Sequence, residues 1–373
     1  MAGIYLHIPF CKQACHYCNF HFSTSLKYKT GMIGAMLREI ELQVPYLEGE
    51  AIETIYLGGG TPSLLDQAEL NLLFDKIHRH FTMAEGPVEI TLEANPDDLH
   101  VEKIKQLRQT PVNRLSIGIQ SFEDEELMRM NRAHCSAEAL AAIQLARDAG
   151  FENLTVDLIY GSPTTSDDQW AANLQQVFDL EIPHLSCYCL TVEEKTALWH
   201  FVKSGKAAPV DEEHAARQFD YLVNTTGLHG YEQYEISNFA RQGWYSRHNS
   251  NYWKGAKYLG IGPSAHSFNG RSRQWNVANN AQYIKALQSG QLPFELEVLT
   301  AEQRYNEYVM TSLRTSWGCD LKQIRELGFE AYFLKIIHPF IQQQFVHQQG
   351  DFFYLTKKGK FLADGIASSL FLI

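Results

Sequence analysis

Several features that would assign this sequence to a membrane, nucleic-acid-binding or secreted class are missing. Nowhere in its 373 residues do apolar side chains continue for the roughly 20 positions that a membrane-spanning helix needs. Clustered Lys and Arg are also missing, and the formal net charge of −11 predicts no nucleic-acid partner, because phosphates bind clustered cations. The first residues carry no positively charged segment, so we expect no targeting sequence.

Cysteines are few and unevenly placed. The seven cysteines are an odd number, and three of them, Cys11, Cys15 and Cys18, lie within eight positions while the others are scattered. A small secreted domain held by disulfides carries an even, regularly spaced set. We therefore expect free thiols and a cytoplasmic protein.

Short β-rich runs alternate with amphipathic stretches over the first two-thirds of the chain. Strands that alternate with helices of about 10–15 residues indicate βαβ units and a parallel sheet. Six such units favour an α/β fold of the partial (β/α)6 barrel type over a sandwich. The predicted strands cover residues 4–8, 52–57, 88–92, 114–119, 154–159 and 185–190.

This alternation stops near residue 228. We predict a barrel over residues 1–228 and an aromatic- and glycine-rich connecting segment over residues 229–295, with long surface loops over residues 231–270. Residues 296–373 are predicted to form a mostly helical, winged-helix-like domain, with a short hairpin around residues 349–351 and a final helix after Thr356. Basic and acidic residues are nearly balanced in this last part, which favours packing over DNA binding.

The motif Cys11-x-x-x-Cys15-x-x-Cys18 directly follows the first predicted strand. In a parallel βα architecture such a loop lies at the C-terminal edge of the strands, where active sites gather. Three thiolates at this spacing can bind three irons of a [4Fe–4S] cluster and leave the fourth iron open to a small molecule. The alternatives are a zinc ion with His16 or His21 as the fourth ligand, and cysteines that only pack.

Strand periodicity provides independent support for a site at the same edge. Along three predicted strands the apolar residues share one face, while Glu93, Gln120 and Asp157 lie on the other. Because helices cover the apolar face, these polar side chains are predicted to converge inside the barrel mouth. The alternative is an internal hydrogen-bond network that only satisfies itself.

Two glycine motifs lead to different predictions. Gly58-Gly59-Gly60-Thr61-Pro62 follows the second predicted strand, and its glycines allow the backbone to approach a ligand closely. Residues 260–265 match the dinucleotide-binding pattern G-x-G-x-x-A only formally, because the preceding apolar run is short for a strand and no acidic residue follows at the required distance. We expect no nucleotide there.

The cysteine motif, Cys-Lys-Gln-Ala-Cys-His-Tyr-Cys, resembles the signature of radical S-adenosylmethionine (SAM) enzymes. The flanking residues 5–10 and 58–63 resemble the oxygen-independent coproporphyrinogen oxidase family, which includes HemN-like and HemW-like proteins, and the similarity extends to at least Phe268. In that family SAM binds the open iron and an electron donor drives its cleavage to a 5′-deoxyadenosyl radical. The resemblance implies these SAM contacts: Tyr5, Tyr17, Gly59, Gly60, Thr61, Glu93, Gln120, Arg132 and Asp157.

Three features favour the HemW-like branch, whose members bind heme and deliver it to acceptor hemoproteins. Phe20 stands where the oxidase has a fourth cysteine, and only ten residues precede Cys11 where the oxidase has an extended region. Residues 248–253 show the H-N-x-x-Y-W motif of HemW-like proteins, and the last domain is expected to be HemN-like. The alternatives are an oxygen-independent coproporphyrinogen III oxidase, a related radical SAM enzyme acting on a heterocycle, and a zinc-stabilised binding module.

His248 is the candidate axial ligand of heme, because an imidazole nitrogen can bind heme iron. Tyr252 and Trp253 follow it and could stack on the macrocycle. An aromatic segment that only covers the barrel is the alternative, and His266 is a second candidate ligand. Cys187 and Cys189 share one strand face and are expected to be buried as small apolar residues.

Overall fold

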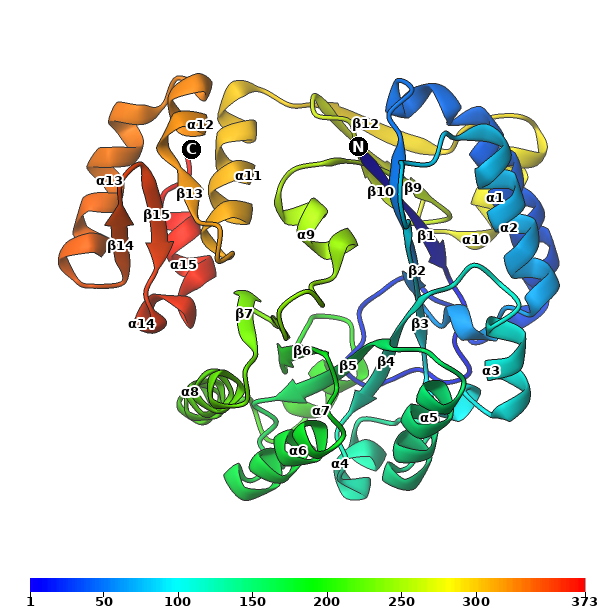
Figure 1. Cartoon of the computed structure of the whole chain (residues 1–373), viewed down its shortest axis with the longest axis horizontal. Helices are drawn as coiled ribbons and strands as arrows, with labels where there is room; N and C mark the ends of the chain where they lie inside the picture. The colour runs from blue at the N-terminus through cyan, green and yellow to red at the C-terminus, as the bar shows by residue number, and fades with distance from the viewer. Residues whose placement is uncertain (373) are drawn as a thin grey trace.

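The computed structural model describes residues 1–372 and shows an α/β architecture on one large curved sheet (Figure 1). Twelve strands form this sheet in the order β12-β11-β10-β9-β1-β2-β3-β4-β5-β6-β8-β7. The strands from β9 to β6 in this order run parallel, and the strands beyond them are antiparallel. The parallel strands are β1 (Ala2–Ile8), β2 (Ile52–Gly59), β3 (Glu89–Ala94), β4 (Arg114–Gln120), β5 (Asn153–Tyr160), β6 (His184–Cys189) and β9 (Lys257–Ile261).

The helices between the parallel strands lie around the outside of the curved sheet (Figure 1). Most of these helices pack their apolar faces on the strands and enclose the main hydrophobic core, to which α4 and α7 contribute no residue. A capping box formed by Asp66 and Glu69 fixes the start of α2. The prediction of an α/β fold with a partial βα barrel is confirmed. These helices are α1 (Lys29–Leu42), α2 (Gln67–His80), α3 (Val101–Leu107), α4 (Asp124–Arg129), α5 (Ser136–Asp148), α6 (Asp167–Asp179), α7 (Ala197–Lys203) and α8 (Glu212–Leu228).

The segment expected to form long surface loops is in fact largely regular structure, so that expectation is wrong. Strand β9 lies parallel beside β1, and its Leu259 and Ile261 are fully buried. The strand is short, contains a glycine and pairs with a strand more than 250 positions away, so neither periodicity nor βαβ spacing revealed it. The other elements of this segment are β7 (Glu232–Glu235), β8 (Asn238–Ala240), α9 (Arg247–Trp253), β10 (His266–Phe268), β11 (Ser272–Asn276), α10 (Asn280–Gln288) and β12 (Phe294–Val298).

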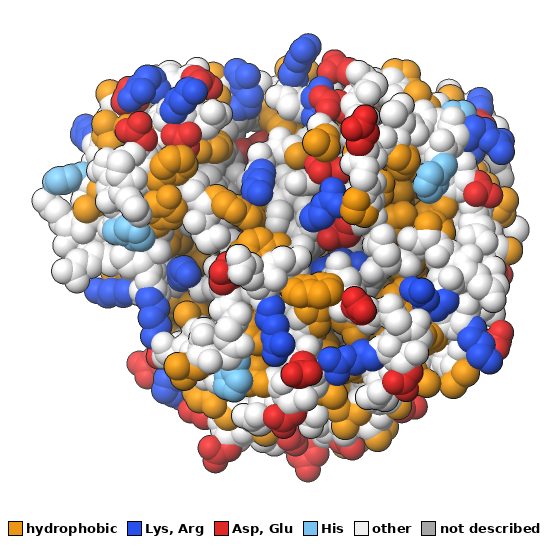
Figure 2. Space-filling view, in the orientation of Figure 1, with side chains coloured by type: hydrophobic (Ala, Val, Ile, Leu, Met, Phe, Trp, Pro, Cys, Tyr) orange, Lys and Arg blue, Asp and Glu red, His pale blue; other side chains and the backbone are white. Residues whose placement is uncertain are grey.

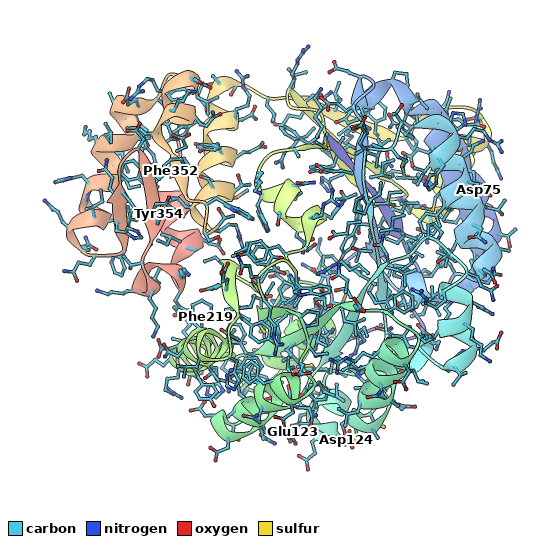
Figure 3. The ribbon with its side chains drawn as sticks, viewed as in Figure 1. Asp75, Glu123, Asp124, Phe219, Phe352 and Tyr354 are labelled. Atoms are coloured by element: carbon cyan, nitrogen blue, oxygen red, sulfur yellow. The ribbon has the colours of Figure 1, made fainter. Side chains whose placement is uncertain are left out.

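The last residues form a unit with its own core, which extends from Tyr305 to Leu370. Helices surround a small antiparallel sheet of order β13-β15-β14, and the predicted hairpin is confirmed as β14 and β15. On β15, the rings of Phe352 and Tyr354 stack with centroids 6.2 Å apart (Figure 3). The elements are α11 (Ala301–Leu313), β13 (Cys319–Asp320), α12 (Leu321–Leu327), α13 (Glu330–Gln342), β14 (Val346–Gln349), β15 (Phe352–Leu355), α14 (Lys357–Lys360) and α15 (Ala363–Ser369).

Several contacts attach this unit to the barrel, and two of them involve Arg314 and Phe219. Arg314, just after α11, donates a hydrogen bond of 2.7 Å from Nε to the carboxylate of Glu235, which is 2% exposed. Phe219 of α8 (Figure 3) packs against Phe361 with ring centroids 5.7 Å apart. A buried, hydrogen-bonded ion pair and an aromatic pair together fix the orientation of the two parts.

No helix among residues 1–372 is both long and apolar enough to pass through a bilayer. Basic and acidic side chains are interspersed on the face of the molecule that Figure 2 shows. The parallel strands all direct their C-terminal ends to one edge of the sheet, and the loops that follow these ends form the site described next.

Candidate functional site

The C-terminal ends of the parallel strands surround a cavity of about 420 Å³. All three cysteines of the motif line it, and so do most of the residues that the family resemblance implies as SAM contacts. The structure therefore brings together residues that are up to about 150 positions apart in the sequence. The lining residues from the predicted SAM set are Tyr17, Gly59, Gly60, Thr61, Glu93, Gln120, Arg132 and Asp157.

Cys11, Cys15 and Cys18 are free thiols, each partly exposed to this cavity. Their loop is closed at its base, where the Cys11 amide donates to the Ser23 carbonyl at 3.1 Å and the Ser23 amide donates to the Pro9 carbonyl at 2.9 Å. Burial raises the pKa of Cys11 to about 11, and the neighbouring thiols add to the shift. Iron binding must therefore displace protons from these sulfurs.

Each of the two histidines considered as a fourth zinc ligand has one ring nitrogen in a hydrogen bond with another part of the chain. His16 Nδ1 lies 2.8 Å from the carbonyl oxygen of Arg129, and His21 Nε2 lies 2.8 Å from Asn280 Oδ1. Within residues 1–372 no three or more His, Cys, Asp or Glu side chains gather around a point where one metal ion could sit. The three thiols line one cavity, and thiolates at this spacing can bind three irons of a cluster.

Arg132 joins three parts of the wall. Its Nη1 donates to the Cys15 sulfur at 3.2 Å, and its Nη2 donates to Asn95 Oδ1 at 2.8 Å and to the Gly118 carbonyl at 2.7 Å. Burial lowers the pKa of Arg132, but its neighbours, foremost Tyr17 and the Cys15 sulfur, raise it by more, so the net shift is upward and the charge is retained. Asn95, which sequence reasoning missed, continues the alternation of β3 two positions after Glu93 and also lines the cavity.

The turn after β2 passes so close to the cysteine loop that it leaves no room for side chains. A Cβ atom at Gly60 would lie 2.6 Å from the carbonyl oxygen of Phe10, and one at Gly59 would lie 2.4 Å from His7 Nδ1. Gly59 also has φ +100°, a conformation that only glycine adopts readily. The glycines thus allow the backbone to form the cavity wall directly.

A bulge at the end of β4 turns Gln120 toward the cavity. The pairing of β4 with β5 shifts register between Ile117 and Gln120, and Gln120 has φ +70°. Non-glycine residues in this left-handed region cost about 1–3 kcal/mol and cluster at functional sites. Bulges of this kind redirect a side chain beside an active site, and no sequence pattern indicated this one.

Glu93 and Asp157 place two carboxyl groups in the cavity wall. Glu93 accepts hydrogen bonds from the Tyr56 hydroxyl at 2.8 Å and from the Gly59 amide at 3.2 Å. Burial raises the pKa of Glu93 to about 7 and that of Asp157 to about 6. Asp157 also raises the pKa of Glu93, while hydrogen bonds from Ser186 and Ser116 oppose the shift at Asp157. A bound cation would reverse these shifts and hold both groups ionised.

Tyr5 is the one predicted SAM contact outside the cavity wall. Its hydroxyl lies 3.2 Å from His7 Nδ1, and its ring stacks on Tyr56 with centroids 6.1 Å apart. Its contact with SAM stays a prediction of the family resemblance. Cys187 is buried as expected, but Cys189 lines the cavity, because β6 ends there.

His248 also lies apart from this cavity. Its Nδ1 is 2.9 Å from the hydroxyl of Thr54, and its ring lies 5.1 Å from that of Tyr56. Burial lowers the pKa of His248 to about 4, so the ring is neutral. His266 is exposed on β10 and stacks on Trp275 with centroids 6.1 Å apart.

Comparisons with known proteins agree with this geometry. Residues 5–177 match the model of the Radical SAM superfamily, and residues 299–362 match that of the HemN C-terminal domain. "Heme chaperone HemW" of Bacillus subtilis is 32% identical over 98% of this chain and 98% of its own length. "Heme chaperone HemW" of Mycobacterium tuberculosis is 33% identical over 99% of this chain and 94% of its own. The chain belongs to the HemW family of radical SAM proteins.

The fold of this HemW family member is also that of a solved relative. The structure described as coproporphyrinogen III oxidase (HemN) from Escherichia coli superposes with a TM-score of 0.85, at 23% identity, over 99% of this chain and 89% of that one. Membership of the radical SAM superfamily implies a [4Fe–4S] cluster and SAM. The residues present fit both: three thiols face one cavity beside a buried cation, and two carboxyl groups lie in the same wall.

Proposed function

We propose that this protein is a cytoplasmic heme chaperone that binds a [4Fe–4S] cluster and SAM, binds heme, and delivers the heme to acceptor hemoproteins. The observation that carries the proposal is the convergence of Cys11, Cys15 and Cys18 with the predicted SAM contacts in one cavity. Kinship with proteins named heme chaperone HemW supports the heme part.

Cys11, Cys15 and Cys18 are proposed to hold three irons, and the bound cluster supplies an open iron and an electron. Arg132 lies against the Cys15 sulfur and offsets thiolate charge. Because SAM carries a sulfonium and an ammonium group, ionised Glu93 and Asp157 would attract it. Gly59 and Gly60 let the backbone approach the ligand, and Thr61 and Gln120 offer hydrogen-bonding groups in the wall.

The H-N-x-x-Y-W motif makes His248 the iron ligand that the sequence alone predicts. With Nδ1 at the Thr54 hydroxyl, Nε2 is the nitrogen through which it would bind iron. If the motif prediction holds, a His248→Ala variant loses the histidine-ligated heme spectrum. Unchanged heme spectra would show that His248 is not the iron ligand and that the motif only packs α9 against β2.

The test uses anaerobically reconstituted protein in two parallel assays. Hemin should bind and then transfer to an apo-hemoprotein, which is measured by the Soret band and by recovered acceptor activity. In the other assay, coproporphyrinogen III, SAM and a reductant should leave the propionate side chains intact. Failure to bind hemin would overturn the chaperone proposal. Formation of a vinyl-bearing product would instead favour the oxidase function, because this chain has the SAM contacts that the resemblance to the oxidase family implies.

A further inference from the structure

A second cavity, of about 400 Å³, lies on the other side of the cysteine loop. Tyr17 and Leu190 line both this cavity and the one described above, so the two share a wall. The second cavity lies between the cysteine loop, the end of α4, the segment after β5, and α7 with the residues that follow it. None of the predicted SAM contacts except Tyr17 reaches it.

The walls of this second cavity are mostly apolar. Leu198 and Phe201 of α7 face it from one side, and Met130 and Val210 line it from others. Met130 and Leu190 belong to a small hydrophobic cluster separate from the main core. A largely apolar pocket of this size with some polar groups is typical of sites for small organic ligands and cofactors.

His16 provides a metal-binding nitrogen on this wall. Its backbone amide donates to the Met130 carbonyl at 3.1 Å, and its carbonyl accepts from the Leu198 amide at 2.8 Å, so the residue is fixed at both ends. Its Nδ1 lies 2.8 Å from the Arg129 carbonyl, which can only accept, so Nδ1 carries the proton and Nε2 has the free electron pair. Histidine ligands of metals use this arrangement, in which a carbonyl fixes the tautomer.

Two cations line the same cavity. Arg129 has a half-exposed side chain, and its one ion pair, with Glu125 at 3.6 Å, is exposed and weak. Lys206 also lines the cavity, and within the described part of the chain no ion pair involves it. The acidic residue in the lining, Glu126, is buried and accepts a hydrogen bond from the Thr164 hydroxyl at 2.6 Å. The cavity thus combines apolar walls and an imidazole with two cations that could bind carboxylates.

We propose that this second cavity binds the heme of the proposed function, on which the inference rests, with His16 Nε2 as the axial iron ligand. The macrocycle would lie edgewise between Leu198, Phe201 and Val210, and its propionates would face Arg129 and Lys206. The shared wall of Tyr17 and Leu190 would separate the heme from the SAM cavity. This assignment differs from the one that the sequence motif at His248 predicts.

The experiment titrates the full, anaerobically reconstituted chain with hemin and, in parallel, with metal-free protoporphyrin. The variants are His16→Ala, Ala207→Trp, His248→Ala and the matched control His200→Ala, an exposed histidine on α7 outside the cavity lining. Hemin affinity should fall about tenfold in His16→Ala, with loss of the histidine-ligated Soret and electron paramagnetic resonance spectra. Protoporphyrin affinity should stay unchanged there, because it has no iron to ligate. Added imidazole should restore the hemin spectrum.

Ala207→Trp fills the cavity without changing a residue of the cysteine loop. It should therefore weaken the binding of both hemin and protoporphyrin, while the cluster content stays normal. His248→Ala and His200→Ala should bind both as the parent does. The inference is overturned if His16→Ala keeps the parent hemin spectrum, if Ala207→Trp binds normally, or if His248→Ala alone loses the spectrum. A parent protein that binds no hemin would instead refute the chaperone function itself.

Discussion

The guanidinium of Arg132 lies 3.2 Å from the sulfur of Cys15, the middle cysteine of the cluster motif. The same guanidinium donates to Asn95 after β3 and to the Gly118 carbonyl in β4. One buried cation therefore fixes the cysteine loop relative to two strands and offsets charge on a proposed iron ligand. An arginine on the surface would do neither.

Replacing Arg132 tests this relationship. Arg132→Met should weaken retention of the cluster by about 1.5–3 kcal/mol, the worth of a hydrogen bond to a charged group. The measurement is the rate of iron loss to a chelator in anaerobic protein. Arg108→Met removes an exposed arginine far from the cavity and serves as the control. Equal rates of iron loss in both variants and the parent would refute a role for Arg132 at the cluster.

The affinity for SAM should depend on pH through Glu93. Because burial raises the pKa of Glu93 to about 7, this carboxyl is largely neutral at pH 6 and ionised at pH 8. Cationic SAM should therefore bind more tightly as pH rises through this range. Glu93→Gln should bind about tenfold more weakly at pH 8 and show a flatter profile, which isothermal titration calorimetry on reconstituted protein would measure.

The same ionisation affects stability in the absence of SAM. A carboxyl whose folded pKa lies above its ordinary value stabilises the fold when protonated, and that contribution is lost as pH rises from about 4.5 to about 7. Asp75→Asn, on the outer helix α2 (Figure 3), is the matched control for both readouts. An unchanged pH profile in Glu93→Gln would contradict the assignment of this carboxyl to the SAM site.

Gly60 should tolerate no side chain. A Cβ atom there overlaps the Phe10 carbonyl, so Gly60→Ala should cost about 1–3 kcal/mol of unfolding free energy and abolish SAM binding. Gly34→Ala, on α1 with open space around it, should instead raise helix stability by up to about 1 kcal/mol. Urea unfolding of both variants measures the difference. Equal unfolding midpoints would show that the turn after β2 accommodates the added methyl group without a loss of stability.

Buried Glu39 of α1 should be essential for attaching β9 to the barrel. Its carboxylate accepts from the Gly262 amide at 2.8 Å, from Asn276 Nδ2 at 2.6 Å and from the Tyr283 hydroxyl. Glu39→Leu leaves these buried donors without an acceptor and should cost about 2–5 kcal/mol in urea unfolding. Glu85→Gln, on an exposed segment, should change little. A loss below about 1 kcal/mol would show that water replaces the carboxylate.

The sequence predicts the parts of the site that depend on local periodicity. Glu93 and Asp157 alternate with apolar neighbours, and the cysteine motif follows a strand, so both could be placed at the barrel mouth. Gln120 is also correctly placed there, but the bulge that turns its backbone depends on the pairing of β4 with β5. No one-dimensional pattern contains that information.

The features that sequence patterns did not reveal depend on contacts between distant segments. Strand β9 is stabilised by pairing with β1, and Tyr5 lies behind the wall because Tyr56 and His7 hold its ring. His16 was considered only as a zinc ligand, and its actual environment is created by α4 and α7, which meet it only in the folded chain. Tertiary packing decides each of these positions.

The central claim, a [4Fe–4S] cluster with one iron open to SAM, is tested most directly by electron paramagnetic resonance of the reconstituted, reduced protein with and without SAM. The account predicts close to four irons and four sulfides per chain, a cluster signal that changes when SAM is added, and loss of both in Cys11→Ser, Cys15→Ser and Cys18→Ser. A colourless protein with one zinc ion, or a cluster signal that does not change when SAM is added, would contradict it.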